Sequence, residues 1–132
     1  MKYSWRNMER YRDKYLDLLS RSGSLIVLDT ETTGIGAKAK VIQFAAIRYK
    51  IKDNFSLEEG AAVNILINPG EKLSEKIVEI TGISDEVLSY ARTEKEEVDD
   101  IFSFLETADL YAIYNKPFDT RMLQGMAERC ER

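Results

Sequence analysis

The sequence predicts an α/β fold in which a sheet of mixed sense is flanked by helices. Three observations point to it. A continuous apolar segment, Leu25–Leu28, is typical of a strand buried on both faces. Two further strand-like segments follow after short connections, and connections that short join antiparallel neighbours. A last strand-like segment comes only after a helical stretch, so we expect it beside the first strand, parallel to it, through a right-handed crossover.

An amphipathic helix is predicted for the N-terminal segment, residues 1–23. Apolar side chains recur there at three- to four-residue spacing from Trp5 to Leu19, as in a helix that packs one face against a core. Acidic residues lie three positions from a row of basic residues, and such rows usually form solvated ion pairs. A contact of the basic row with nucleic acid or with a partner stays open. The basic row is Lys2, Arg6, Arg10 and Lys14.

Residues 24–132 are predicted to form one domain. Ser84 is the kind of residue that caps helices, and Gly82 is suited to ending one. The predicted elements are, in order, strands at 24–30, 41–50 and 62–68, helices at 74–80, from 85 onward and at 93–106, a strand at 109–114, and a helix opened by Pro117.

The composition indicates a globular protein and excludes several chemistries. Of the 132 residues, 44% are hydrophobic and 32% charged, as expected of one folded domain. The net charge of −4 argues against general binding of polyanions, although metal ions can neutralise an acidic site. The absence of histidine rules out a Ser-His-Asp triad and a His-Glu-x-x-His zinc site within this chain. Its single cysteine, Cys130, fits a reducing cytoplasm, and we expect neither a membrane span nor a signal segment.

Acidic residues gather where the first and last strands are predicted to end. Asp29 is expected at the penultimate position of the first strand, Glu31 two residues further on the same side, and Asp119 just after the last strand. The carboxyl ends of parallel neighbours share one sheet edge, where open α/β sheets usually bind ligands. Clustered carboxylates repel unless a cation joins them, and Mg²⁺ and Mn²⁺ prefer such oxygens. Two such ions about 4 Å apart can orient a water, lower its pKa and stabilise the leaving oxygen of a phosphodiester.

Each acidic segment also has an ordinary structural interpretation. Residues 29–34 can be a plain turn, although buried strands seldom end in two free acids. Asn115 and Asp119 suit a helix start, because Asn caps helices and an early acid complements the helix dipole. Both segments lie at predicted strand ends, and the two ends are expected at the same sheet edge. Their occurrence together favours a functional site.

These segments resemble motifs of the DEDD, or DnaQ-like, 3′→5′ exonucleases, which include the proofreading epsilon subunit of bacterial DNA polymerase III. Asp-Thr-Glu-Thr-Thr-Gly (29–34) is similar to the first motif. Tyr-Asn-Lys-Pro-Phe-Asp (114–119) is similar to the second, commonly His-Asn-x-x-Phe-Asp. Residues 68–86 resemble the segment that leads into a Gly-Ile-Thr turn. The resemblance covers residues 24–132 and implies a ribonuclease-H-like fold.

The resemblance implies metal-dependent release of nucleoside monophosphates from the 3′ ends of single-stranded DNA. RNA stays open as a substrate, and a DNA polymerase subunit as a partner. Two Mg²⁺ or Mn²⁺ ions are implied: Asp29 bridges both, Glu31 binds the ion that activates water, and Asp119 holds the second. The implied contacts of the terminal nucleotide are Thr32, Thr33, Gly34, Ile83, Asn115 and Phe118.

Two departures from the family pattern leave an alternative open. The third motif supplies a fourth aspartate and a histidine or tyrosine base, and none of the thirteen residues after Asp119 is Asp, His or Tyr. Glu128 lies nine residues along the helix, roughly 13 Å away, too far for the same metal. Tyr114 stands where histidine is common. We therefore expect the C-terminal part of the fold to be missing and part of the core to be exposed. The alternative function is a catalytically incomplete fragment, or a module that binds nucleic acid or a polymerase.

Overall fold

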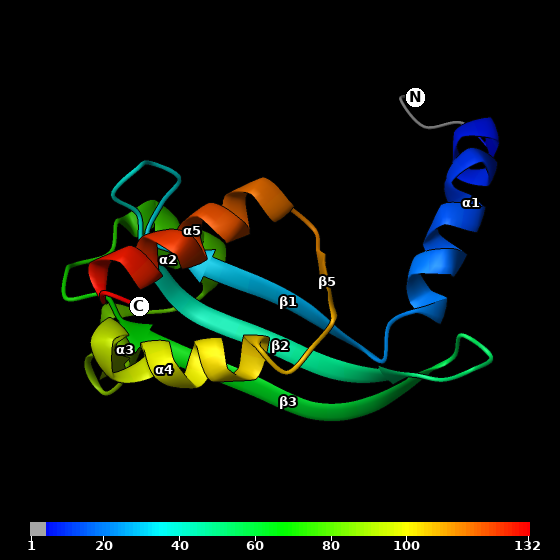
Figure 1. Ribbon diagram of the computed structural model, residues 1–132. Coiled ribbons are helices and arrows are strands. Elements are labelled where there is room, and N and C mark those ends of the chain that lie inside the picture. The colour runs from blue at the N-terminus through cyan, green and yellow to red at the C-terminus, as the bar shows by residue number, and fades with distance from the viewer. Residues whose placement is uncertain (1–4) are drawn as a thin grey trace.

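The computed structural model describes the backbone of residues 5–132 and the side chains of residues 11–132. The predicted basic row at Lys2, Arg6 and Arg10 therefore lies outside the described side chains. Figure 1 shows a sheet with helices packed at its side and at one end. The elements are α1 (Trp5–Ser20), β1 (Ser24–Thr32), β2 (Val41–Ile51), β3 (Leu57–Asn68), α2 (Glu75–Thr81), α3 (Asp85–Ser89), β4 (Arg92–Thr93), α4 (Glu94–Leu105), β5 (Leu110–Ile113) and α5 (Lys116–Arg129).

The five strands form a sheet in the order β4-β3-β2-β1-β5. β1, β2 and β3 make an antiparallel meander, in which Asp29 lies opposite Ala45 and Ala45 opposite Asn64. β5 runs parallel to β1, with Leu25 opposite Leu110. This arrangement confirms the predicted α/β fold of mixed sense, and it confirms that the last strand lies beside the first.

Two strand boundaries are predicted wrongly by two or more residues, and one short strand is not predicted. β1 continues to Thr32 instead of ending at residue 30, because its β-branched threonines are buried and extend the alternation of the strand. Asp29 therefore lies inside the strand and is not its penultimate residue. β3 begins at Leu57 instead of residue 62, since its polar first half pairs with the end of β2. The sequence also fails to predict β4, whose two residues form a strand only by pairing with β3.

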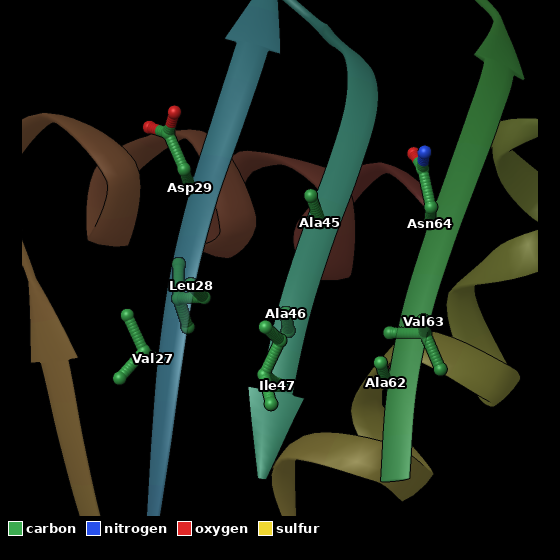
Figure 2. Close-up of a pocket in the computed structure, with 9 residues that line it drawn as sticks. All are labelled: Val27, Leu28, Asp29, Ala45, Ala46, Ile47, Ala62, Val63 and Asn64. Atoms are coloured by element: carbon green, nitrogen blue, oxygen red, sulfur yellow. The ribbon is translucent and has the colours of Figure 1, made fainter. Parts of the chain in front are cut away.

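The main core lies between the sheet and the two long helices α4 and α5. Side chains of β1, α4 and α5 meet there, and Figure 2 shows both helices behind the same face of the sheet. A smaller core joins α2 and α3 to the end of the sheet through Ile42, Leu73, Ile83 and Leu88. The main core includes Ile26, Leu28, Phe44, Ile67, Val98, Ile101, Met122 and Met126.

The helix ends follow signals in the sequence. The Ser84 side chain accepts a hydrogen bond from the backbone N–H of Val87 and so caps α3. Gly82 ends α2 with φ of 72°, a left-handed conformation that glycine adopts without steric cost. Thr93 and Glu96 form a reciprocal capping box at the start of α4. These ends confirm the predicted stops and starts of the helical region.

The predicted N-terminal helix forms as α1, and the part of its apolar stripe whose side chains are described, from Tyr11 onward, does not join either hydrophobic core. Figure 1 shows α1 standing apart from the sheet. Tyr15 remains 61% exposed and Leu18 40% exposed. Where α1 leads into β1, the Gly23 N–H donates to Oδ2 of Asp109 at 2.8 Å, so the chain is anchored just past the helix to the segment before β5. Among the helices of the described residues, none is long and apolar enough to cross a membrane.

Candidate active site

Asp29 and Glu31 lie on one face of β1, since side chains alternate along a strand. Asp29 is exposed and Glu31 is half-buried. Figure 2 shows the Asp29 side chain on the face turned away from α5. Thr30, between the two acids, is 7% exposed and faces the core. β1 therefore displays two carboxylates on its open face and a hydroxyl on its buried face.

The parallel pairing of β5 with β1 brings Asp119 to the same end of the sheet. β5 leads directly into α5, and Asp119 lies in the first turn of that helix with its backbone N–H donating to the Asn115 carbonyl at 3.0 Å. Its side chain is only 3% exposed. The Thr30 hydroxyl donates to Oδ1 of Asp119, across 89 positions of sequence. The expected meeting of the two acidic segments is therefore present in the fold.

Glu31 and Asp119 are each affected by their surroundings and by neighbouring negative charge. Burial raises the pKa of Glu31, and the negative charges of Asp29 and Asp119 raise it further. Burial also raises the pKa of Asp119; the hydrogen bond from Thr30 opposes this, and the charge of Asp29 adds to it. Their mutual repulsion is the situation that a bound cation relieves.

This donor set fits a hard divalent cation. Carboxylate oxygens are the ligands that Mg²⁺ and Mn²⁺ prefer. Within the described residues, no three acidic, histidine or cysteine side chains are gathered tightly enough to enclose one ion. Such tight grouping is not required, because Mg²⁺ usually keeps several waters and is held by one or two carboxylates together with substrate phosphates.

Two threonines stabilise the loop between β1 and β2 through hydrogen bonds within the loop. The Thr32 hydroxyl donates to the Gly34 carbonyl at 2.6 Å. Two hydrogen bonds join Thr33 to Lys40. The Thr33 N–H donates to the Lys40 carbonyl at 2.8 Å, and the Thr33 hydroxyl accepts from the Lys40 N–H at 3.0 Å. A Cβ atom on Gly34 would meet no heavy atom within 4 Å. Nothing within the described fold therefore requires glycine at residue 34.

The start of α5 presents Asn115 and Phe118 beside this loop. Asn115 occupies the N-cap position, yet its side chain makes no capping hydrogen bond, which weakens the purely structural interpretation of this residue. Phe118 is half-buried against the main core. The Arg121 guanidinium lies 5.7 Å from the centre of the Phe118 ring and donates to the Ile35 carbonyl of the loop at 3.5 Å. Arg121 thus joins the two segments that flank the carboxylates.

Ile83 occupies a more enclosed position than the other predicted contacts. It is 9% exposed and packs in the smaller core with Leu73 and Leu88. Its backbone N–H is already engaged within the fold, since it donates to the Thr81 hydroxyl at 3.1 Å. Little of its side chain is therefore available to contact a base.

The face of the sheet opposite α4 and α5 is hollowed, and Figure 2 draws the side chains that line the hollow. A trough of about 440 Å³ crosses β1, β2 and β3, with Asp29 at its rim. Val27 is 42% exposed there. The lining residues are Val27, Leu28, Asp29, Ala45, Ala46, Ile47, Ala62, Val63 and Asn64.

Two residues of this region were not predicted from the sequence. Thr30 contacts Asp119, and the only signal for it is its place between two acids on a strand, which turns it toward the core. Arg121 contacts the β1–β2 loop, and no pattern in the sequence indicates that contact.

A mixed sheet with carboxylates from β1 and α5 at one end agrees with the class of protein that the family comparison gives, the exonucleases. The chain belongs to the DEDD, or DnaQ-like, 3′→5′ exonuclease family: the family model described as exonuclease (RNase_T) matches residues 26–132. It is 32% identical over 114 residues to a PolC-type DNA polymerase III of Thermotoga petrophila, which covers 86% of this chain and 8% of that protein. It is also 32% identical over 104 residues to an uncharacterized exonuclease of Escherichia phage 186, covering 78% of this chain and 48% of that protein.

Solved structures share the fold at lower sequence identity. Product-bound exonuclease I superposes with a TM-score of 0.71 at 22% identity, over 83% of this chain and 26% of that one. Cell-death related nuclease 4 gives a TM-score of 0.68 at 23% identity, over 83% of this chain and 41% of that one. The ribonuclease-H-like fold is thereby confirmed. The chain spans less than half the length of each of these relatives.

Proposed function

We propose that this chain is the catalytic part of a metal-dependent exonuclease that releases nucleoside monophosphates from the 3′ ends of single-stranded DNA. One observation carries the proposal: Asp29 and Glu31 lie on β1, and the hydroxyl of Thr30 between them donates to Asp119 of α5, so the three carboxylates lie at the same end of the sheet. An all-carboxylate site without histidine suits hydrolysis of a phosphodiester.

Two Mg²⁺ or Mn²⁺ ions would be held by these carboxylates, with Asp29 shared between them, Glu31 on one and Asp119 on the other. Bound ions of this kind orient the attacking water and stabilise the charge that develops on the phosphodiester. The raised pKa values of Glu31 and Asp119 support a cationic ligand, because a cation would offset the repulsion from Asp29.

The terminal nucleotide would lie between the β1–β2 loop and the start of α5. Thr32 and Thr33 shape the loop, and the open space over Gly34 leaves room for close approach of a ligand to the backbone. The uncommitted amide of Asn115 and the ring of Phe118 would contact the sugar and base, since apolar and stacking contacts hold single strands without reading sequence. Ile83 would contribute at most the edge of its side chain.

DNA is the proposed substrate, and a DNA polymerase the proposed partner. The support is the similarity to PolC-type DNA polymerase III and to E. coli exonuclease I, which has been solved with a dA16 oligonucleotide. An epsilon-like proofreading role in the cytoplasm follows from the same similarity and from the single cysteine. RNA is the alternative substrate, and contacts to the 2′-hydroxyl would decide between them.

The open trough beside Asp29 favours a second candidate function. The family pattern implies a fourth aspartate on a further helix, and an apolar trough with an alanine floor has the shape to receive one. Without that helix the chain would act as a module that binds nucleic acid or a polymerase and does not cut.

A single-turnover digestion tests the proposed function. The wild-type chain is incubated with 5′-labelled single-stranded DNA, or with the RNA of the same sequence, and with Mn²⁺. Asp29→Ala is the inactive variant, and Asp53→Ala, an exposed acid in the β2–β3 loop at the other end of the sheet, is the matched control. We expect a ladder that shortens from the 3′ end with wild type and with Asp53→Ala, and none with Asp29→Ala. Calorimetric Mn²⁺ binding with no ladder would support the binding module instead.

A further inference from the structure

We propose that Thr30 is a positioning residue that holds the Asp119 carboxylate in the orientation needed to bind a divalent cation. The inference rests on the proposed function, because it concerns the same metal site. It concerns a residue to which neither the sequence motif nor the proposed metal ligands give a role. The observation behind it is the hydrogen bond from the Thr30 hydroxyl to Oδ1 of Asp119.

The geometry of β1 makes Thr30 the residue suited to this contact. Strand alternation sends the carboxylates of Asp29 and Glu31 to the open face and the Thr30 hydroxyl to the buried face, toward α5. Thr30 is 7% exposed and Asp119 is 3% exposed, so water competes little for either group. The hydrogen bond therefore couples the strand that carries two of the carboxylates to the helix that carries the third.

A buried carboxylate requires a donor of this kind. A charge removed from water is costly unless hydrogen bonds replace its hydration, and bonds to an ionised acceptor are the stronger ones. No buried side-chain oxygen or nitrogen in the described residues lacks a partner, and Thr30 supplies the side-chain donor to Asp119. Thr30 also reaches Asp119 through its backbone, so removing the hydroxyl takes away the side-chain bond to Oδ1 and loosens, without abolishing, the hold on this carboxylate. A less firmly held carboxylate should bind a cation more weakly.

The shape of threonine adds to the rigidity of the contact. A β-branched side chain in a strand has restricted χ1 rotation, so the hydroxyl stays aimed at Asp119 while the methyl group packs in the core. Serine keeps the donor with greater freedom, and valine keeps the shape without the donor. Comparing threonine, serine and valine at residue 30 therefore distinguishes the contribution of the hydroxyl donor from that of side-chain packing.

The test measures Mn²⁺ binding by calorimetry, with no nuclease activity involved. Partners that orient metal ligands typically change metal affinity by about 10- to 100-fold when removed. We expect Thr30→Val to weaken Mn²⁺ binding at least about tenfold, and Thr30→Ser to weaken it by less than about threefold. Thr107→Val is the matched control: it removes a threonine hydroxyl that donates to the Phe104 carbonyl at 2.7 Å instead of to a carboxylate, and Thr107 lies beside Ser24 at the start of β1, away from the three acids. Its Mn²⁺ affinity should match that of wild type.

The outcomes separate this inference from the proposed function. Wild-type affinity in Thr30→Val would overturn the role of Thr30 and leave the nuclease proposal intact. Weakened binding in Thr30→Val together with a chain that does not cut DNA would support Thr30 and overturn the nuclease. A wild-type chain that binds no Mn²⁺ would overturn both.

A second measurement does not depend on the stability of any variant. In a crystal structure of the wild-type chain grown with Mn²⁺, the Thr30 hydroxyl should still donate to Asp119 while that carboxylate faces the ion. A structure in which Asp119 has turned away from Thr30 to reach the ion would overturn the proposal.

Discussion

Asp29 is the residue whose charge acts on both other carboxylates. Burial is the main cause of the raised pKa of Glu31 and of Asp119, and the charge of Asp29 raises both further, while the Asp29 side chain is exposed on the open face of β1. Three neighbouring negative charges oppose folding of the metal-free chain, as strained or repulsive groups at functional sites often do. The candidate site therefore has a stability cost that can be measured without any substrate.

Replacing Asp29 with asparagine should stabilise the metal-free protein. The amide would keep the shape of the side chain and remove one source of repulsion, so we expect Asp29→Asn to raise the Tm by a few degrees in EDTA at neutral pH. The variant should also lose the rise in Tm that Mn²⁺ gives the wild type by binding the folded state. Thermal melts with EDTA and with Mn²⁺ measure both effects, and Asp53→Asn is the control. An unchanged or lower Tm in EDTA would contradict the repulsion inferred for Asp29.

The same repulsion predicts how stability depends on pH. Glu31 and Asp119 have raised pKa values in the folded chain, so the folded state keeps their protons to higher pH than the unfolded state does. Their contribution to stability is complete below their ordinary values of 4.5 and 3.8 and is lost as pH rises through the raised values. We expect urea melts in EDTA to show wild-type stability falling over this window relative to a Glu31→Gln, Asp119→Asn variant. A difference that is constant with pH would contradict the raised values.

A substitution at Gly34 should affect catalysis without affecting stability. Because a Cβ atom there would meet nothing within 4 Å, Gly34→Ala should change the free energy of unfolding by less than about 0.5 kcal/mol. If a nucleotide approaches that backbone, kcat/KM on single-stranded DNA should fall about tenfold or more. Gly36→Ala, equally unobstructed in the same loop, is the control and should leave both quantities near wild type. A fall in Tm for Gly34→Ala would show that the glycine serves the fold.

At the scale of single residues, the sequence indicates the three acidic candidates, but it does not indicate the threonine that hydrogen-bonds one of them. Asp29, Glu31 and Asp119 could be found because each stands at a predicted strand end. Thr30 could not be assigned, because its partner lies 89 positions away and the contact depends on how α5 is seated. Side-chain bonds within the β1–β2 loop are likewise set by the conformation of the loop and not by a motif.

Among the elements, α5 determines where Asp119 lies. Met122 and Met126 on its inner face pack in the main core. Near its C-terminal end, Arg129 contacts both carboxylate oxygens of Glu94, with Nε at 3.1 Å from each and Nη2 at 2.6 Å from Oε1. This paired contact ties the end of α5 to the start of α4 and so fixes the direction in which α5 leaves the site.

Removing that contact should loosen the helix pair. We expect Arg129→Met to lower the free energy of unfolding by about 1 kcal/mol, because the ion pair is partly enclosed and doubly bonded. Arg21→Met removes the exposed pair with Asp17, which has a single 2.9 Å contact, and should cost less than about 0.5 kcal/mol. Urea denaturation compares the two variants. Equal effects would indicate that Arg129 contributes no more than a surface pair.

Elements are predictable to different degrees for physical reasons. The helices around Ser84 and Thr93 are marked by caps, which are local signals in the sequence. The first half of β3 holds Glu58, Glu59 and Gly60, whose composition does not indicate a strand, and it is extended only because β2 lies beside it. β4 exists only through its pairing with the end of β3. Where pairing partners create a strand, a single segment cannot reveal it.

At the scale of the whole molecule, α1 and the rest of the chain are separate in space. Figure 1 shows the helix apart from the sheet, and the chain is held at Gly23 and Ser24 by contacts with the segment before β5. The amphipathic pattern of this segment predicts a helix correctly, but it does not reveal whether the apolar stripe has a partner. A stripe predicts burial only when something lies opposite it.

Removal of α1 should therefore leave the fold intact. We expect a chain of residues 22–132 to keep its Tm within about 2 °C of the full chain, since changes away from packed contacts usually have small effects. Differential scanning calorimetry gives the comparison, with Mn²⁺ titration as a check on the site. A much lower Tm would mean that α1 packs on the body of the protein in solution.

The order of the strands has a consequence for how the chain folds. β1, β2 and β3 are successive neighbours, so their pairing closes only short loops. The pairing of β1 with β5 closes a much longer loop, which contains the intervening helices. Contacts between distant segments form late and open early. A newly made chain can thus hold Asp29 and Glu31 on a finished meander while Asp119 is still far away. The carboxylate site comes into being with the last pairing of the sheet, so a partly folded chain carries no complete site.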